Sequence, residues 1–352
     1  MSPTDKPVRQ SSFELLRIIS MLMIVVHHFI VHPLNGESGL ANSSIGLIIN
    51  QLSSVGVNLF ILISGYFKIH TSWKGFLRLY GYIVFYCLLV YGFHLWHSHE
   101  SIAFPVMKTI FLHPFSNGGW WFMLCYLGLY LCAPLLNIAI EHIPTKKDCL
   151  LILCLITIVN VYLGNSRQSL YFGYDGYGFQ QMIYMYLIGG YIRLYVSPLW
   201  VKKHRYALFG AYFAFCLLWL GFDKLQTALS YSIFIPGYNN PFVICASICL
   251  FLFVSSFHFH SKLVNYIAAS ILAAYLIQDS YYFGQLWLYP YVGQCYENAL
   301  LGEQLLYMGL FSICLLTGSV LIDQIRILLD RFLFYILHKP NKTTETVSLS
   351  KK

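Results

Sequence analysis

The chain has 352 residues and a formal net charge of +8; 58% of its residues are hydrophobic and only 10% are charged. Ordinary soluble domains carry roughly 25% charged residues, so the composition excludes a soluble globular protein, whose surface needs a polar shell. Apolar segments of about 20 residues recur, which is the length that crosses a bilayer. The sequence therefore predicts a polytopic membrane protein.

Taken in chain order, ten segments are long enough to cross a hydrocarbon layer about 30 Å thick. They are residues 11–31, 45–67, 76–96, 121–140, 149–165, 178–197, 206–222, 241–257, 264–283 and 303–323. The first segment is too long for the apolar part of a cleaved signal peptide. An amphipathic stretch follows the last segment, and the polar end has the composition of a disordered tail. The predicted organisation is a cytoplasmic N-terminal segment (1–10), an all-α transmembrane bundle (11–338) and a disordered cytoplasmic tail (339–352).

The distribution of Lys and Arg predicts the orientation of these spans. With the N-terminus inside, 18 of the 22 basic residues fall in inner segments or in the C-terminal tail, and only Lys108, Arg167 and Lys224 fall in outer segments. This bias follows the positive-inside rule. Both termini are therefore expected in the cytoplasm, as parts of a multi-pass protein of the plasma or inner membrane. The net charge reflects this inner face and gives no reason to expect a nucleic acid partner.

The first span contains an unusual set of ionisable residues: Glu14, Arg17, His27 and His28. Arg17 and His28 are 11 residues apart, or about three turns, so both project from one side of the helix at depths about 16 Å apart. Glu14 precedes Arg17 at the spacing of an i,i+3 ion pair. Ionisable groups in a membrane usually face a protein interior or a wet cavity, and we expect the same here. The alternative is that Arg17 extends to the inner headgroups and the histidines lie at the outer boundary.

Neither the histidines nor the ten cysteines indicate a metal site. His27 and His28 are adjacent in the helix and point about 100° apart, and no further ligands stand at a matching spacing. The cysteines lie mostly inside apolar segments, and their spacing indicates neither a disulfide framework nor a zinc site. Tyr and Trp residues are frequent in the predicted outer loops, where they either anchor the protein at the interface or line a sugar site.

Several motifs together resemble the integral-membrane acyltransferase-3 family. Glu14-Leu-Leu-Arg17, followed by ten residues and His28, resembles the acidic residue, Arg, ten residues and His with which that family opens. The second span, SSVGVNLFILISGYF, resembles the aromatic-rich family segment that ends in Ser-Gly, here Ser64-Gly65. The stretch GGWWFMLCYLGLYLCAPLLN resembles the Trp-containing fourth span.

Two further segments extend the resemblance to about residues 10–335. The third span begins WKGFLRLYGY, where Lys74 and Arg78 match two positions of an arginine cluster in the family. The segment NYIAASILAAYLIQDSYYF resembles one that often reads Tyr-Leu-Ile-His, but this chain has Gln278 in place of the histidine. This departure argues against an essential proton transfer at position 278, but it leaves the site on the first span unaffected.

The resemblance implies an enzyme that transfers an acyl group, usually acetyl, from coenzyme A to a hydroxyl of a cell-surface or exported polysaccharide. Acyl-CoA would be a donor substrate, and no permanently bound cofactor is expected. Attack of a hydroxyl on a thioester needs a proton acceptor, and an imidazole serves near neutral pH. His28 is the predicted base, supported by Arg17 and Glu14, with His27 as the reserve candidate. Direct transfer and a relay through an acylated histidine both stay open.

The donor carries phosphate groups, which guanidinium and ammonium groups bind. Arg17, Lys74 and Arg78 are the predicted donor-binding residues; the alternative for Lys74 and Arg78 is that they only orient the protein. The predicted acceptor-binding residues are His27, Asn58, Ser64, Trp120, Trp121, Gln278 and Asp279, with Glu303 as a weaker candidate. For each of these, helix packing or interfacial anchoring is the alternative.

A membrane transporter or flippase for a glycan or a small metabolite is the rival function from another class. Transporters often contain internal repeats and interrupted helices, and residues 1–170 show no convincing repeat in residues 171–340. A purely structural membrane scaffold would leave the Arg and His face of the first span unexplained.

Overall fold

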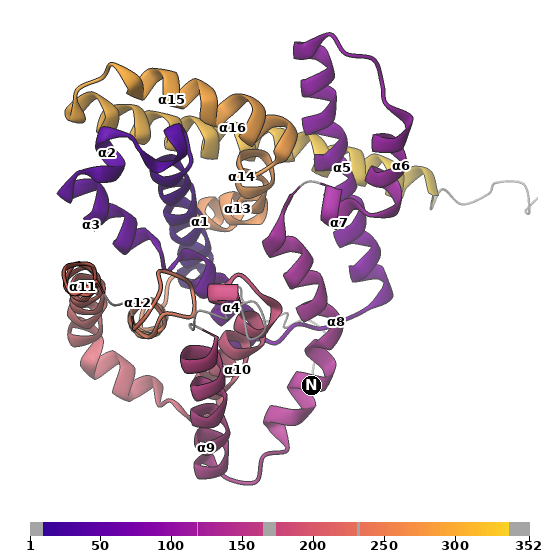
Figure 1. Cartoon of the computed structure of the whole chain (residues 1–352). Coiled ribbons are helices and arrows are strands. Elements are labelled where there is room, and N and C mark those ends of the chain that lie inside the picture. The colour runs from indigo at the N-terminus through magenta and orange to yellow at the C-terminus, as the bar shows by residue number, and fades with distance from the viewer. Residues whose placement is uncertain (1–9, 118, 165–173, 231–232, 338–352) are drawn as a thin grey trace, which may run out of the picture.

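The computed structural model describes residues 10–117, 119–164, 174–230 and 233–337, and every regular element in this part of the chain is a helix (Figure 1). The predicted all-α class is thereby confirmed. Most of the predicted N-terminal segment (1–10) and the predicted disordered tail (339–352) lie outside the described residues.

The helices are α1 (Ser11–Val31), η1 (Pro33–Gly36), α2 (Gly39–Asn42), α3 (Ser44–Ser53), α4 (Gly56–Phe67), α5 (Trp73–Ser98), α6 (Phe104–Leu112), α7 (Pro114–Asn117), α8 (Trp121–Glu141), α9 (Lys146–Thr157), η2 (Ile158–Leu163), η4 (Tyr174–Gly176), α10 (Phe179–Tyr195), α11 (Pro198–Ala228), α12 (Pro241–Ser255), α13 (Lys262–Ser270), α14 (Leu272–Gln278), η5 (Tyr281–Leu288), α15 (Tyr289–Glu297) and α16 (Leu301–Leu337). Of the irregular helices, η1 and η4 are 3₁₀ helices, and η2 and η5 are π helices.

Within the described residues, six helical segments are long and apolar enough to cross a membrane. They are Ser11–Val31, Ser44–Phe67, Trp73–Ser98, Trp121–Glu141, Pro198–Ala228 and Leu301–Phe332. A seventh span results if Lys262–Gln278 and Tyr281–Glu297, which meet at a bend of 64°, are counted together. The remaining predicted spans fall on shorter or interrupted helices: α9 with η2, the 17-residue α10 and the 15-residue α12. The total of ten spans and the cytoplasmic termini therefore stay predictions.

The amphipathic stretch expected after the last span is part of that span's helix, because α16 continues without a break for 37 residues. A buried ion pair lies near the point where the amphipathic stretch was expected to begin. Asp323 is fully buried, pairs with Arg326 at 2.6 Å and accepts a hydrogen bond from the Tyr86 hydroxyl of α5 at 2.9 Å. This group ties the C-terminal half of α16 to α5.

Helix α1 lies in the middle of the bundle and contacts α3, α4, α12, α13, α14 and α16 (Figure 1). Next to it, α4 packs closely on α10. A Cβ added at Gly65 would overlap the backbone of Tyr186, so only glycine permits this approach. Such small-residue contacts are typical of helix packing in membranes. The Ser64-Gly65 motif therefore has a packing role at its glycine.

A buried amide network fixes the loop before α12 against α4 and α10. Gln181 donates hydrogen bonds to the Asn58 side chain at 2.9 Å and to the Tyr238 carbonyl at 2.8 Å, and it accepts one from Asn160 at 2.6 Å. Asn58 also donates to the Tyr238 carbonyl at 2.9 Å. The side chains of Asn58, Asn160 and Gln181 are almost completely buried. Because each buried amide has partners, the network holds Tyr238 in a defined position.

The chain between α14 and η5 is a break inside the bent pair. Ser280 lies at the N-cap of η5, where its hydroxyl accepts from the backbone N–H groups of Phe283 and Gly284 at 3.3 Å each. A Cβ at Gly284 would overlap the Gln278 carbonyl, so the turn requires glycine there. Backbone groups freed by a break at membrane depth need such internal partners. The break presents Asp279 to the centre of the bundle.

Candidate functional site

One face of α1 lines an internal cavity. Arg17, Met21, Ile24 and His28 follow each other at spacings of three or four residues, so they share one side of the helix. Met21, Ile24 and His28 line a narrow hollow with about 330 Å³ of empty space, including space open to the surroundings. Arg17 lies on the same face towards the start of α1 and pairs with Glu14 at 2.7 Å, at the spacing predicted from the sequence.

Aromatic side chains form most of the opposite walls of this cavity. Trp121 and Phe122 of α8, Phe60 of α4, Tyr275 of α14 and Tyr238 line it. The rings of Trp121 and Tyr238 stack, with centroids 5.6 Å apart. A small cavity with flat rings and few polar groups has the composition of a binding site for an organic ligand.

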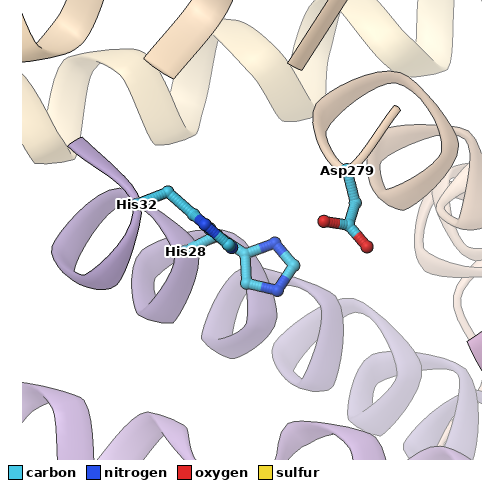
Figure 2. Close-up of side chains that lie close together, drawn as sticks. All are labelled: His28, His32 and Asp279. Carbon is cyan, nitrogen blue, oxygen red and sulfur yellow. The ribbon is translucent and has the colours of Figure 1, made fainter. Parts of the chain in front are cut away.

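Three groups that could exchange protons or bind a ligand meet beside the cavity. The side-chain ligand atoms of His28, His32 and Asp279 all lie within 4.8 Å of one another. Figure 2 shows the two imidazoles projecting from α1 and its end towards Asp279, which comes from the break after α14. His32 follows the last residue of the span; burial lowers its pKa to about 4, and His27 contributes to the same shift. At neutral pH His32 is therefore an uncharged imidazole.

Two polar neighbours fix the position of His28. The Tyr289 hydroxyl lies 3.4 Å from its Nδ1, and the Tyr289 ring stacks on His32 with centroids 4.5 Å apart. Gln278 is completely buried, donates to the Val25 carbonyl of α1 at 3.2 Å and lies beside the imidazole. Gln278 thus ties α14 to α1 at the level of His28.

His27 points away from this cluster. Its Nδ1 forms a hydrogen bond of 2.6 Å with Asn50 of α3. The cavity that His28 lines does not include His27. The two neighbouring histidines therefore have different surroundings, as the helical rotation between them predicted.

The other predicted acceptor-binding residues divide into two groups. Trp121 and Asp279 lie at the cavity or beside His28, whereas Asn58 is used in the buried amide network. Ser64 donates to the Phe60 carbonyl within its own helix at 2.9 Å. Trp120 is buried and does not line the cavity, and its indole nitrogen has no hydrogen-bond partner in the described part of the chain.

Three predicted residues lie elsewhere. Lys74 and Arg78 are exposed on α5, do not line the cavity and form no ion pair or hydrogen bond among the described residues. Glu303 is exposed and accepts a hydrogen bond from the Leu300 backbone at 2.7 Å, which caps its own helix. The structure therefore does not bring these three residues to the cavity.

Sequence reasoning missed His32, Tyr289 and Tyr238. A signal for His32 was present, because it stands four residues after His28 and therefore on the same face. Tyr289 and Tyr238 come from distant segments and had no local signal. They reach the site only because the bent span and the loop before α12 fold back towards α1.

The same three groups are the candidate ligands of a divalent cation. Two histidines at an i,i+4 spacing with a carboxylate from another helix form a donor set that suits zinc. The sequence did not predict this set, because the carboxylate is 251 residues away from His28 in the chain. Metal binding and proton acceptance by His28 would exclude each other at the same nitrogen.

Comparison with known proteins assigns nearly the whole chain to one family model. The model is described as an acyltransferase domain and matches residues 10–323. No curated protein and no solved structure matches the chain.

Proposed function

Because the chain belongs to the acyltransferase-3 family, we propose that it is an integral membrane O-acetyltransferase. It transfers acetyl from acetyl-CoA to a hydroxyl of a cell-surface or exported polysaccharide. The observation that carries this proposal is the face of α1, on which His28 lines an internal cavity with Arg17 three turns away. Ionisable groups on one face of a helix inside an apolar bundle are a mark of function.

His28 is the general base in this mechanism. As the acceptor oxygen attacks the thioester carbonyl, the hydroxyl proton moves to the imidazole. The tetrahedral intermediate then collapses: the carbon–sulfur bond breaks, the acetyl ester forms, and the proton passes from the imidazolium to the leaving thiolate. In this proposal transfer is direct, with the acceptor and the thioester both placed at the hollow that His28 lines.

Asp279 has two roles in the proposal. Its carboxyl group lies no more than 4.8 Å from a nitrogen of His28, so in its ionised form it stabilises the imidazolium that forms during the reaction. Its second oxygen accepts a hydrogen bond from the sugar. Tyr289, next to His28 Nδ1, holds the ring in orientation.

The two substrates reach the site from opposite ends of the bundle. The donor enters from the cytoplasm past Arg17, whose guanidinium attracts its phosphate groups. The arrangement of basic residues supports this orientation, because Lys68 and Arg193 both pair with Glu141 near the end of the bundle where α4 and α10 finish. Lys74 and Arg78 stay a further, sequence-based prediction for donor binding.

The acceptor sugar approaches from the outer end. Trp121 and Tyr238 present flat rings to the cavity, and such rings stack on the C–H faces of carbohydrates. The amide network that includes Asn58 supports this wall by fixing Tyr238. The proposed contribution of Asn58 is therefore to position the aromatic wall, and Trp121 and Asp279 contact the sugar.

The broken span is a feature that transporters share, and it is the observation that favours the rival function. Here the break presents a carboxyl group to the imidazole that we propose as the base. Together with the family assignment, this favours chemistry over transport.

The test is acetyl transfer by the purified protein in lipid vesicles, with radiolabelled acetyl-CoA and glycan extracted from the host cell surface. We expect the wild-type protein to label the glycan and His28→Ala to reduce the rate by at least about 100-fold, which is typical for loss of a general base. His27→Ala is the matched control, since this neighbour is bonded to Asn50 and faces away.

Labelling that persists unchanged in His28→Ala contradicts the role of that residue. If His27→Ala abolishes labelling of the glycan and His28→Ala retains it, His27 and not His28 is the base. Glycan that crosses the vesicle membrane without gaining acetyl would support the transporter instead.

A further inference from the structure

A second hollow lies at the N-terminal end of α1, between the end of α10, the start of α11 and the end of α12. It encloses about 1140 Å³, including space open to the surroundings. Resting on the proposed function, we propose that this cleft binds the phosphorylated nucleotide portion of the acyl-CoA donor. Nothing in the sequence motifs pointed to this place.

The cleft carries positive charge without a compensating acid. Lys202 and Arg205, in the first turns of α11, line it, and none of the described lining residues is Asp or Glu. Lys202 forms no ion pair or hydrogen bond among the described residues. By contrast, Arg17, Lys68 and Arg193 are each paired with a glutamate. Free ammonium and guanidinium groups in a cleft are suited to phosphate oxygens.

The environment of Arg205 holds its guanidinium in place without neutralising it. Its carbon lies 4.8 Å from the Tyr206 ring centroid and 5.5 Å from that of Phe257, and one nitrogen donates to the Tyr206 hydroxyl at 3.0 Å. Stacking on two rings leaves the edge of the guanidinium available for bidentate binding of phosphate.

The rest of the cleft offers a mixed surface for the other parts of such a donor. Phe13, Ile192 and Leu252 provide apolar walls for a base or a pantetheine arm, while Ser255, Ser256 and His258 add polar groups. Polar and apolar surface in one hollow matches a molecule that has a charged nucleotide at one end and an extended thiol arm at the other.

One face of α1 connects the cleft with the catalytic cavity. Phe13 lines the cleft and stands four residues before Arg17, on the face that continues to His28. The distance along the helix from Phe13 to His28 is about 22 Å, at 1.5 Å per residue. Phe13 stacks on Tyr66, which also lines the cleft, with centroids 5.2 Å apart. The donor's arm would pass these two rings and Arg17 to bring its thioester to His28.

The cleft is a different place from the Lys74 and Arg78 pair on α5. Neither of these residues lines the cleft or the cavity. Helix α5 packs on α6, α7, α14 and η5, whereas the cleft lies among α1, α10, α11 and α12. The two places therefore make separate predictions for donor binding.

The experiment measures coenzyme A binding by calorimetry to the full-length protein in phosphatidylcholine nanodiscs, together with steady-state transfer kinetics. We expect Lys202→Ala/Arg205→Ala to weaken binding of coenzyme A, and of adenosine 3′,5′-bisphosphate, by about 10- to 100-fold, the range for losing charged hydrogen bonds. KM for acetyl-CoA should rise by the same factor while kcat at saturating donor is retained, because these contacts are remote from the thioester.

Two variants serve as comparisons. Lys203→Ala/Arg331→Ala removes the same two charges from exposed positions outside the cleft and should leave binding unchanged. Lys202→Arg/Arg205→Lys keeps the charges and should retain most of the affinity for coenzyme A. This result would show that the cleft variant loses affinity through its missing charges and not through misfolding.

Equal losses in the cleft variant and in Lys203→Ala/Arg331→Ala would overturn the inference, as would unchanged binding in the cleft variant. A loss of coenzyme A binding that occurs only in Lys74→Ala/Arg78→Ala would overturn the inference and leave the proposed function intact. If the cleft variant loses affinity only for phosphatidylglycerol added to the discs, the cleft is a lipid site and the inference fails. A wild-type protein that binds no coenzyme A, yet acetylates glycan from another donor, would refute the donor in the proposed function and this inference with it.

Discussion

The charge of Asp279 should be worth about two orders of magnitude in the rate of transfer. Asp279→Asn keeps the size of the side chain and one hydrogen-bonding oxygen but removes the negative charge. The carboxylate lies no more than 4.8 Å from a nitrogen of His28. At that separation and an effective dielectric constant of ~20, a carboxylate and an imidazolium attract each other by about 3.5 kcal/mol. Since 1.36 kcal/mol corresponds to a factor of ten, kcat should fall about 400-fold.

The assay is initial-rate acetyl transfer with the donor and the acceptor varied separately. Loss of charge stabilisation lowers kcat, whereas loss of an acceptor hydrogen bond alone raises the acceptor KM and leaves kcat intact. Glu297→Gln is the control, because this carboxylate is exposed at the end of α15 and lies outside the site. An unchanged kcat in Asp279→Asn, with or without a higher acceptor KM, would refute the electrostatic reasoning.

Three further predictions follow from the packing and the polar contacts. Gln181→Leu removes three buried hydrogen bonds and should lower the free energy of unfolding by about 2 to 4 kcal/mol; an unchanged midpoint of thermal unfolding in detergent would contradict the network's structural role. Gly65→Ala forces a methyl group against the backbone of Tyr186 and should destabilise the bundle by about 1 to 3 kcal/mol or more. The control Gly81→Ala has open space around it and should leave the midpoint of thermal unfolding unchanged or raise it. Removing divalent metals with a chelator should leave acetyl transfer unchanged, and a loss that zinc restores would show that His28, His32 and Asp279 hold a metal instead of exchanging a proton.

Much of the candidate site could be predicted from the first helix alone. Helical periodicity placed Glu14, Arg17 and His28 on one side and turned His27 away, and the structure agrees on each of these points. Such predictions succeed because relations within one helix depend only on its 3.6-residue repeat. The same rule would have added His32, which stands one turn after His28.

Predictions for positions outside α1 were less successful. Asn58 looked equally suited to a cavity and to helix packing, and only the position of Gln181, 123 residues later, shows that it belongs to a structural network. Trp120 and Trp121 could not be distinguished in sequence, yet Trp120 is buried away from the cavity lining and Trp121 lines the cavity. The last span was predicted to end at residue 323 with an amphipathic stretch after it, because no local signal shows that Asp323 would be buried against Tyr86.

The sequence by itself determined that this is a helical membrane protein, which family it belongs to, and which face of its first span is polar. The class and the polar face follow from composition and from short-range periodicity, and the family follows from the resemblance of several short motifs; none of these needs knowledge of neighbours in space. Only the tertiary structure decided which groups face that span. The break after α14 brings Asp279 beside His28, and the loop before α12 brings Tyr238 to the cavity, across separations of hundreds of residues. Such contacts between distant residues depend on how whole helices pack. Packing is determined by shape complementarity and by buried hydrogen bonds, which a single segment does not encode.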